Sequence, residues 1–76
     1  MNNQIQKLIK ETKPSIELNL LSGETDLLRE GHLDSLEMIE LIRLLEVTHG
    51  FDIDEYEKKF ESFTISNIEY FLNENI

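Results

Sequence analysis

The sequence predicts an all-α fold, a small bundle of three main helices and one short helix. Apolar residues recur at the spacing of an amphipathic helix in four segments, and glycine, proline or capping residues separate those segments. Strand-like alternation occurs only in the short run IELNLL, residues 16–21, where a lone strand would have no partner. With 76 residues, the chain is expected to form one domain, residues 1–76, around one modest core.

The first helix is expected over residues 3–12, ahead of Pro14, which cannot continue a helix. Its apolar face consists of Ile5, Leu8 and Ile9. Residues 14–33 then form a long connection with many apolar residues: Ile16, Leu18, Leu20, Leu21, Leu27 and Leu28. We therefore expect this connection to pack against the body of the protein rather than to form a free linker.

The clearest helix is expected over residues 35 to about 48, roughly 20 Å long, with Gly50 ending it. A helical wheel places one apolar group on the core-facing side: Met38, Leu41, Ile42 and Leu45. The other side mixes charged and apolar residues: Leu36, Glu37, Ile39, Glu40, Arg43, Glu46 and Val47. Such a mixture is typical of a docking surface, where acids steer a partner and apolar groups hold it. Alternatively, these are ordinary surface residues, and the connection covers some of them, Ile39 first of all.

The start of this helix carries the pattern of a capping box. Asp34 as N-cap can accept a hydrogen bond from the backbone N–H of Glu37, and Glu37 can accept one from Asp34 in return. Leu33 and Met38 stand at the positions of a hydrophobic staple. These assignments leave Ser35 at the first helical position, exposed and without a capping role. Serine is itself a preferred N-cap, but a box starting at Ser35 would need Met38 to close it, which it cannot do.

Two more helices are expected in the last third of the chain. A short one over residues 55–61 places Tyr56, Phe60 and Phe63 at helical spacing. Thr64 is expected to cap the final helix. The buried face of that helix consists of Ile65, Ile68, Phe71 and Leu72. We interpret the aromatic residues as core.

Composition narrows the class of function. The chain has 16 acidic and 7 basic residues, and the formal net charge of −9 repels nucleic acid and anionic membranes. Partners with basic patches are expected, although acidity also simply keeps a small protein soluble. There are no cysteines, no signal-peptide pattern at the N-terminus and no run long enough for a membrane helix, so a cytoplasmic location is expected.

Signals for catalysis or metal binding are weak. His32, Asp34 and Ser35 contain the residue types of a hydrolytic triad, but neighbours so close in sequence cannot readily adopt its geometry. The segment DIDEYEKKFE, residues 52–61, lacks the central glycine of a calcium loop. His32 and His49 lie at opposite ends of one helix and are interpreted as surface or loop residues. We expect no catalytic residue, no metal site and no enzymatic activity of the chain's own.

Ser35 is instead suited to carry a phosphate group. An exposed serine at a helix N-terminus faces free backbone N–H groups and the positive end of the helix dipole. This position at the helix N-terminus favours phosphorylation of Ser35 and attachment of a larger phosphodiester equally. The acidic face of the same helix would lie beside the modified serine.

The segment LDSLEMIELIRLLEVTHGFDID, followed by FTISNIEYFL, resembles acyl carrier proteins and the related peptidyl and D-alanyl carriers. The shared pattern is Asp-Ser-Leu at the start of a helix, apolar spacing through that helix, a Gly-x-x-Ile-like exit, and a short helix before a Thr-capped final one. The likeness extends over roughly residues 27–72. It implies an acyl-carrier-like bundle and a single carrier domain.

The resemblance also implies a cofactor. Ser35 would accept 4′-phosphopantetheine from coenzyme A, transferred by a separate magnesium-dependent phosphopantetheinyl transferase. The thiol of that arm would carry acyl or aminoacyl groups as thioesters between enzymes of a fatty-acid, polyketide, nonribosomal-peptide or related pathway. By similarity, Asp34 and Leu36 flank the attachment point. The docking surface for the basic rims of partner enzymes would comprise Glu37, Ile39, Glu40, Arg43, Glu46 and Val47, and the carrier is expected to act as a monomer.

Several residues depart from the pattern of fatty-acid carriers. Gly31 stands one residue earlier than usual, Arg43 replaces a commonly apolar residue and His49 a usual phenylalanine, and Lys58 and Lys59 interrupt the acidic surface. These departures favour a specialised pathway. The competing hypothesis is a small acidic helical interaction module without a prosthetic group, in which Ser35 is bare or phosphorylated.

Overall fold

The computed structural model describes residues 3–74, and these residues form four α-helices and one 3₁₀ turn. The elements are α1 (Asn3–Thr12), η1 (Leu18–Leu20), α2 (Ser35–His49), α3 (Ile53–Lys59) and α4 (Ile65–Glu74). Within residues 3–74 there is no strand, only one isolated β-bridge between Asp26 and Thr64. The prediction of an all-α domain with three main helices and one short one is confirmed.

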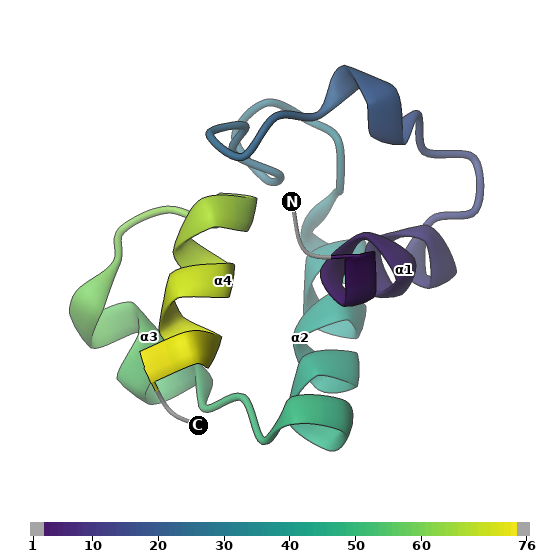
Figure 1. Cartoon of the computed structure of the whole chain (residues 1–76). Helices are drawn as coiled ribbons and strands as arrows, with labels where there is room; N and C mark the ends of the chain where they lie inside the picture. Colours follow the sequence, from purple (N-terminus) through teal and green to yellow (C-terminus); the bar gives the residue numbers. More distant parts are fainter. Residues whose placement is uncertain (1–2, 75–76) are drawn as a thin grey trace.

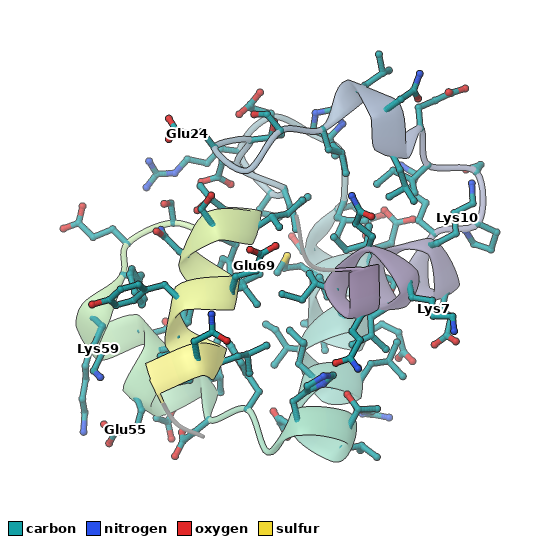
Figure 2. All side chains as sticks on the ribbon, viewed as in Figure 1. Lys7, Lys10, Glu24, Glu55, Lys59 and Glu69 are labelled. Carbon is teal, nitrogen blue, oxygen red and sulfur yellow. The ribbon has the colours of Figure 1, made fainter. Side chains whose placement is uncertain are left out.

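The helices form two pairs that enclose one core. Figure 1 shows α1 against α2 on one side and α3 against α4 on the other, while the connection between α1 and α2 passes over one end of the bundle. All side chains are drawn in Figure 2, where charged groups such as Lys7 and Glu55 point outward. The start of α2 lies where this connection rejoins the bundle.

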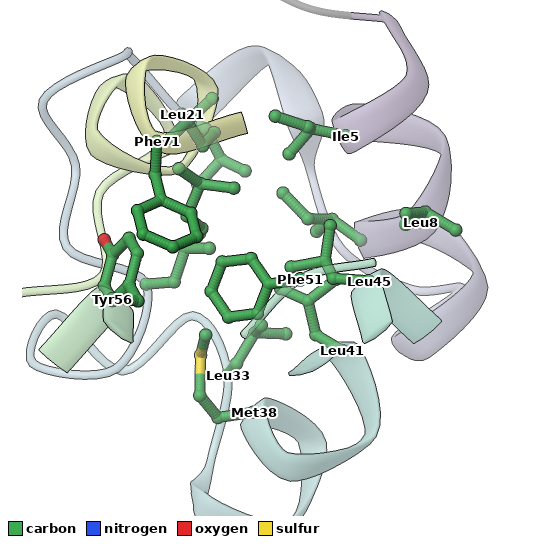
Figure 3. Close-up of a cluster of buried hydrophobic side chains, with 14 of the residues drawn as sticks. Ile5, Leu8, Leu21, Leu33, Met38, Leu41, Leu45, Phe51, Tyr56 and Phe71 are labelled. Carbon is green, nitrogen blue, oxygen red and sulfur yellow. The ribbon is translucent and has the colours of Figure 1, made fainter. Parts of the chain in front are cut away.

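The core combines aliphatic side chains from α1 and α2 with aromatic rings from the second half of the chain (Figure 3). Ile5 and Ile9 from α1 and Leu41 and Leu45 from α2 are fully buried. The ring of Tyr56 lies 5.0 to 5.4 Å from the centroids of four other rings: Phe51, Phe60, Phe63 and Phe71. The predicted core face of α2 is confirmed: Met38 is buried with Leu41 and Leu45, and Ile42 is partly buried against them.

The connection packs as expected, although not with every apolar residue. Ile16, Leu21 and Leu27 are buried. Leu20 and Leu28 are exposed, which the sequence analysis did not predict, because the turns that bury their neighbours direct these two side chains outward.

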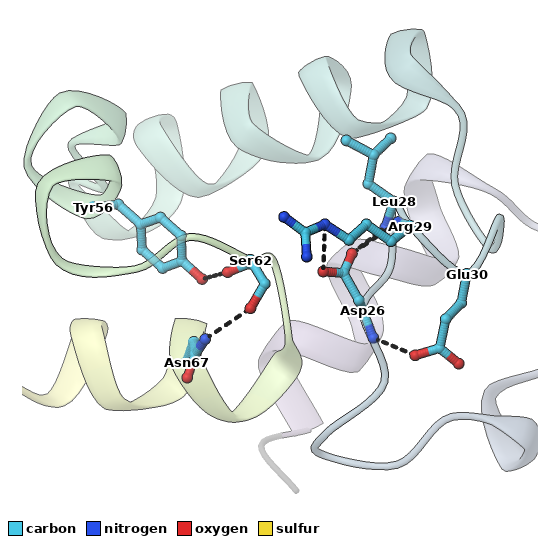
Figure 4. Close-up of polar contacts among 7 residues, drawn as sticks. All are labelled: Asp26, Leu28, Arg29, Glu30, Tyr56, Ser62 and Asn67. Atoms are coloured by element: carbon cyan, nitrogen blue, oxygen red, sulfur yellow. Dashed lines mark hydrogen bonds and ion pairs between the residues drawn. The ribbon is translucent and has the colours of Figure 1, made fainter.

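A network of hydrogen bonds fixes the middle of the connection (Figure 4). The buried Asp26 carboxylate accepts hydrogen bonds from the backbone N–H groups of Leu28 (3.1 Å) and Arg29 (2.8 Å), and the Asp26 N–H donates to Glu30 (2.8 Å). The backbone of Leu27 also donates to the carbonyl of Phe63 at 3.1 Å. These contacts join the connection to the segment that leads into α4.

The boundaries of α3 differ from the prediction of 55–61. The helix begins at Ile53 because Asp52 caps it, accepting from the N–H groups of Asp54 (3.0 Å) and Glu55 (3.2 Å). It ends at Lys59, and Phe60 is already extended, with φ −132° and ψ 141°. The predicted Thr64 cap of α4 is confirmed, since its hydroxyl accepts from the N–H of Asn67 at 3.1 Å.

Candidate functional site

Ser35 is the first residue of α2 and follows its N-cap, Asp34. The Asp34 carboxylate accepts from the N–H of Glu37 at 2.8 Å, and the Asp34 N–H donates to the Glu37 carboxylate at 2.9 Å. The predicted capping box is therefore present. Ser35 is exposed, and within residues 3–74 its hydroxyl forms no hydrogen bond. The box forms without the Ser35 side chain.

Buried residues before and after the capping box anchor the start of α2 to the core. Leu33 and Met38, the two residues predicted to form a hydrophobic staple around the box, are both buried. The backbone N–H of Leu33 donates to the carbonyl of Leu27 at 2.9 Å, and that of Met38 donates to the carbonyl of Asp34 at 2.8 Å. Ser35 is thus an exposed side chain on a well-anchored turn.

The environment of Ser35 is suited to a negatively charged group. Within the described part of the chain, the backbone N–H groups of Ser35 and Leu36 have no hydrogen-bond acceptor. These groups lie at the positive end of the dipole of α2, a helix of 15 residues. The Asp34 carboxylate accepts from the Glu37 N–H, so it does not occupy the N–H groups of Ser35 and Leu36.

The exposed residues predicted to contact partners gather on the side of α2 opposite the core. We call this surface the α2 outer face; it consists of Leu36, Ile39, Glu40, Arg43, Glu46 and Val47. Leu36, Ile39 and Val47 are 77%, 57% and 79% exposed. The alternative that the connection covers Ile39 is wrong, since this side chain stays exposed while Ile16, Leu21 and Leu27 of the connection pack into the core. No ion pair joins Arg43 to another residue of the 3–74 segment.

Glu37 has a different environment from the other acids of α2. Its carboxylate closes the capping box and lies 3.8 Å from the ammonium of Lys13. The side chain is only 28% exposed. Glu40 and Glu46 are exposed and have no such contacts in the described structure. The open acidic groups of the α2 outer face are therefore Glu40 and Glu46, about 7 and 16 Å along the helix axis from Ser35.

Lys13 is a residue of this site that the sequence analysis missed. It follows the last residue of α1, and its ammonium donates to the carbonyl of His32 at 3.0 Å, besides the ion pair with Glu37. The lysine and His32 are 19 residues apart in sequence. No local pattern signals this contact, because it depends on the path of the whole connection.

The two histidines do not join Ser35 in a catalytic arrangement. The ring of His49 is hydrogen-bonded to Thr48 (2.6 Å) and to Gln4 (2.9 Å) at the far end of α2. The ring of His32 forms no hydrogen bond to Ser35 or Asp34. Among the described residues, no group of three His, Cys, Asp or Glu side chains could hold a metal ion.

Among the described residues, surface hollows include three with volumes of about 370, 440 and 410 Å³. Two lie beside α1 and one at the turn between α2 and α3, and none of these three is lined by Ser35. None of the described helices is both long enough and apolar enough to span a lipid bilayer.

Comparisons of the chain with protein-family models, with curated proteins and with solved structures found no match.

Proposed function

We propose that this protein is a carrier of the acyl carrier type, with Ser35 as the attachment site of 4′-phosphopantetheine. The observation that carries the proposal is the Ser35 hydroxyl, which is exposed and, within residues 3–74, not hydrogen-bonded, at the first position of a helix whose capping box forms without it. The Asp-Ser-Leu resemblance supplies the chemical identity of the attached group. Together they support covalent modification over a purely structural role.

The residues around Ser35 fit a phosphodiester. When this serine attacks coenzyme A, a bond forms between its oxygen and the pantetheine phosphorus, and adenosine 3′,5′-bisphosphate leaves while the transferase takes the hydroxyl proton. The free N–H groups of Ser35 and Leu36 would hold the resulting anion, with support from the dipole of α2. The attached arm supplies a thiol for thioester chemistry, which a chain without cysteine cannot supply itself.

The α2 outer face supports docking of the enzymes that load and unload such a carrier. Leu36 and Ile39 expose apolar surface within the first two turns after the attachment point. Glu40 and Glu46 add negative charge along the same face, which attracts basic surfaces and orients their approach. Phosphopantetheinyl transferases and acyl- or aminoacyl-handling enzymes with basic rims are the partners that this surface would fit.

The test is intact-mass analysis after incubation with coenzyme A, magnesium and a broad-specificity phosphopantetheinyl transferase. We expect one phosphopantetheine group on the wild-type chain and none on Ser35→Ala. Ser66→Ala is the matched control, because Ser66 is also an exposed serine in the first turn of a helix. It should be modified like the wild type. An unmodified wild-type chain, under conditions that modify a known carrier, would contradict the proposal and favour a non-covalent acidic interaction module.

A further inference from the structure

Lys13 joins three parts of the chain at the base of the Ser35 turn. Its own N–H donates to the carbonyl of Ile9 at 2.9 Å, which extends the last turn of α1. Its ammonium reaches the carbonyl of His32, three residues before Ser35, and the carboxylate of Glu37, two residues after it. The lysine therefore contacts the chain on both sides of the serine.

The Glu37 oxygen near Lys13 is the same atom that closes the capping box. Glu37 Oε1 accepts from the Asp34 N–H at 2.9 Å and lies 3.8 Å from Lys13 Nζ. Both side chains are about one third exposed or less, at 32% and 28%. The positive charge of Lys13 therefore favours the side-chain orientation in which the Glu37 carboxylate closes the box.

From this geometry we infer that Lys13 is a positioning residue for the modification of Ser35, an inference that rests on the proposed function. Its ammonium holds the residues before and after Ser35 in the conformation that presents the hydroxyl to a transferase. Group transfer requires the attacking oxygen to be held in a narrow range of positions. A protein whose binding-competent conformation is only partly populated binds its partner correspondingly more weakly.

Lys10 provides a matched control on the same helix. Its ammonium donates to the carbonyl of Ile16 at 3.1 Å, so it also ties α1 to the connection. It does so near the other end of the connection, and within residues 3–74 it forms no hydrogen bond or ion pair with Asp34 or Glu37. Lys10→Met and Lys13→Met remove the same charge and one hydrogen bond each, while both keep an unbranched side chain. Only Lys13→Met disturbs the Ser35 turn.

The experiment combines two measurements on Lys13→Met, Lys13→Arg, Lys10→Met and wild-type apo-protein. Hydrogen exchange should show the N–H of Glu37 exchanging about fivefold faster in Lys13→Met, as expected for loss of one charge-assisted contact. With the broad-specificity transferase and coenzyme A, the KM for this variant should rise about two- to fivefold while kcat is unchanged. Lys13→Arg should restore both values to within about twofold, and Lys10→Met should match the wild type.

Three results would overturn the inference. Unchanged exchange at Glu37 would show that Lys13 does not hold the turn. Faster exchange in Lys13→Met with unchanged transferase kinetics would show that Lys13 has a purely structural role. An equal rise in KM for Lys10→Met would show that the rise comes from the change in overall charge. Failure of the proposed function is distinct, because the wild-type chain itself would then remain unmodified in the same assay.

Discussion

The carboxylate of Asp34 and the backbone N–H of Glu37 are hydrogen-bonded at 2.8 Å, and Ser35 lies between these two residues without taking part. We therefore expect the two neighbouring positions to respond differently to alanine. Asp34→Ala should lower the free energy of unfolding by about 1 kcal/mol through loss of the N-cap. Ser35→Ala should change it by less than about 0.5 kcal/mol. Urea denaturation measures both, and a larger loss for Ser35→Ala would give the serine a structural role.

Charge reversal should affect docking alone at Glu40 but both docking and stability at Glu37. Glu40→Lys leaves every described contact intact, so the fold should be unchanged while transfer slows about three- to tenfold at low salt and less at high salt. Glu37→Lys opens the capping box and places two ammonium groups together at Lys13, so it should also destabilise the fold. The helical wheel places both residues on the outer side of the helix, and only the folded structure shows that Lys13 lies beside Glu37. Thermal unfolding followed by circular dichroism measures the stability of both variants, and transferase kinetics measures their rate of modification.

The apolar part of the α2 outer face should matter for docking but not for stability. Leu36→Gln and Ile39→Gln replace exposed side chains, so the free energy of unfolding should change by less than about 0.5 kcal/mol. Transferase KM should rise for both variants. Leu41→Ala, on the buried side of the same helix, is the contrasting control and should cost about 2 to 5 kcal/mol. Unaltered kinetics in both glutamine variants would remove the α2 outer face from the docking model.

Alkaline pH should destabilise the protein through Tyr56. Burial among the other rings, together with the negative charge of Asp26, raises the pKa of the Tyr56 phenol well above its usual range, while Asn67 lowers it slightly. The unfolded chain loses the phenolic proton near pH 10, whereas the folded chain retains it. Stability is therefore complete below about pH 10 and declines as the pH rises further.

Tyr56→Phe tests this dependence. The variant loses the hydrogen bond from the phenol to the Ser62 carbonyl, at 2.7 Å, and should be about 1 kcal/mol less stable at neutral pH. Its free energy of unfolding should decline less steeply than that of the wild type between about pH 10 and 12. The exposed Tyr70 provides the control, because Tyr70→Phe should keep the wild-type slope. The free energy of unfolding is measured by urea denaturation at each pH. An equal decline with pH in all three proteins would show that Tyr56 is not the responsible group.

The parts of the structure that the sequence predicted well are local. The box at Asp34 and Glu37 spans four residues, and the Gly50 exit adopts the left-handed φ of 65° that glycine permits, so both could be inferred from neighbouring residues. The end of α3 was misplaced because Phe60 and Phe63 keep helical spacing in the sequence, although the chain is already extended at Phe60. Three rings can converge on one core without belonging to one helix.

The parts that sequence analysis could not reach depend on the path of the connection. Lys13 meets His32 only because residues 14–31 fold back over the end of α2. Ile39 stays exposed, whereas Leu21 and Leu27 of the same connection are buried in the core. Close approach also explains Gly23, where a Cβ atom would collide with the hydroxyl of Ser66 in α4. Such contacts join residues far apart in sequence and leave no periodic signal.

The central claim is that Ser35 carries the arm, and peptide mapping by tandem mass spectrometry tests it most directly. The wild-type chain is treated with coenzyme A and the transferase, digested, and fragmented to locate the added group. We predict a phosphopantetheine ester on Ser35 and on no other serine. A group found on Ser66 or another serine, or no added group while a control carrier is fully modified, would contradict the account.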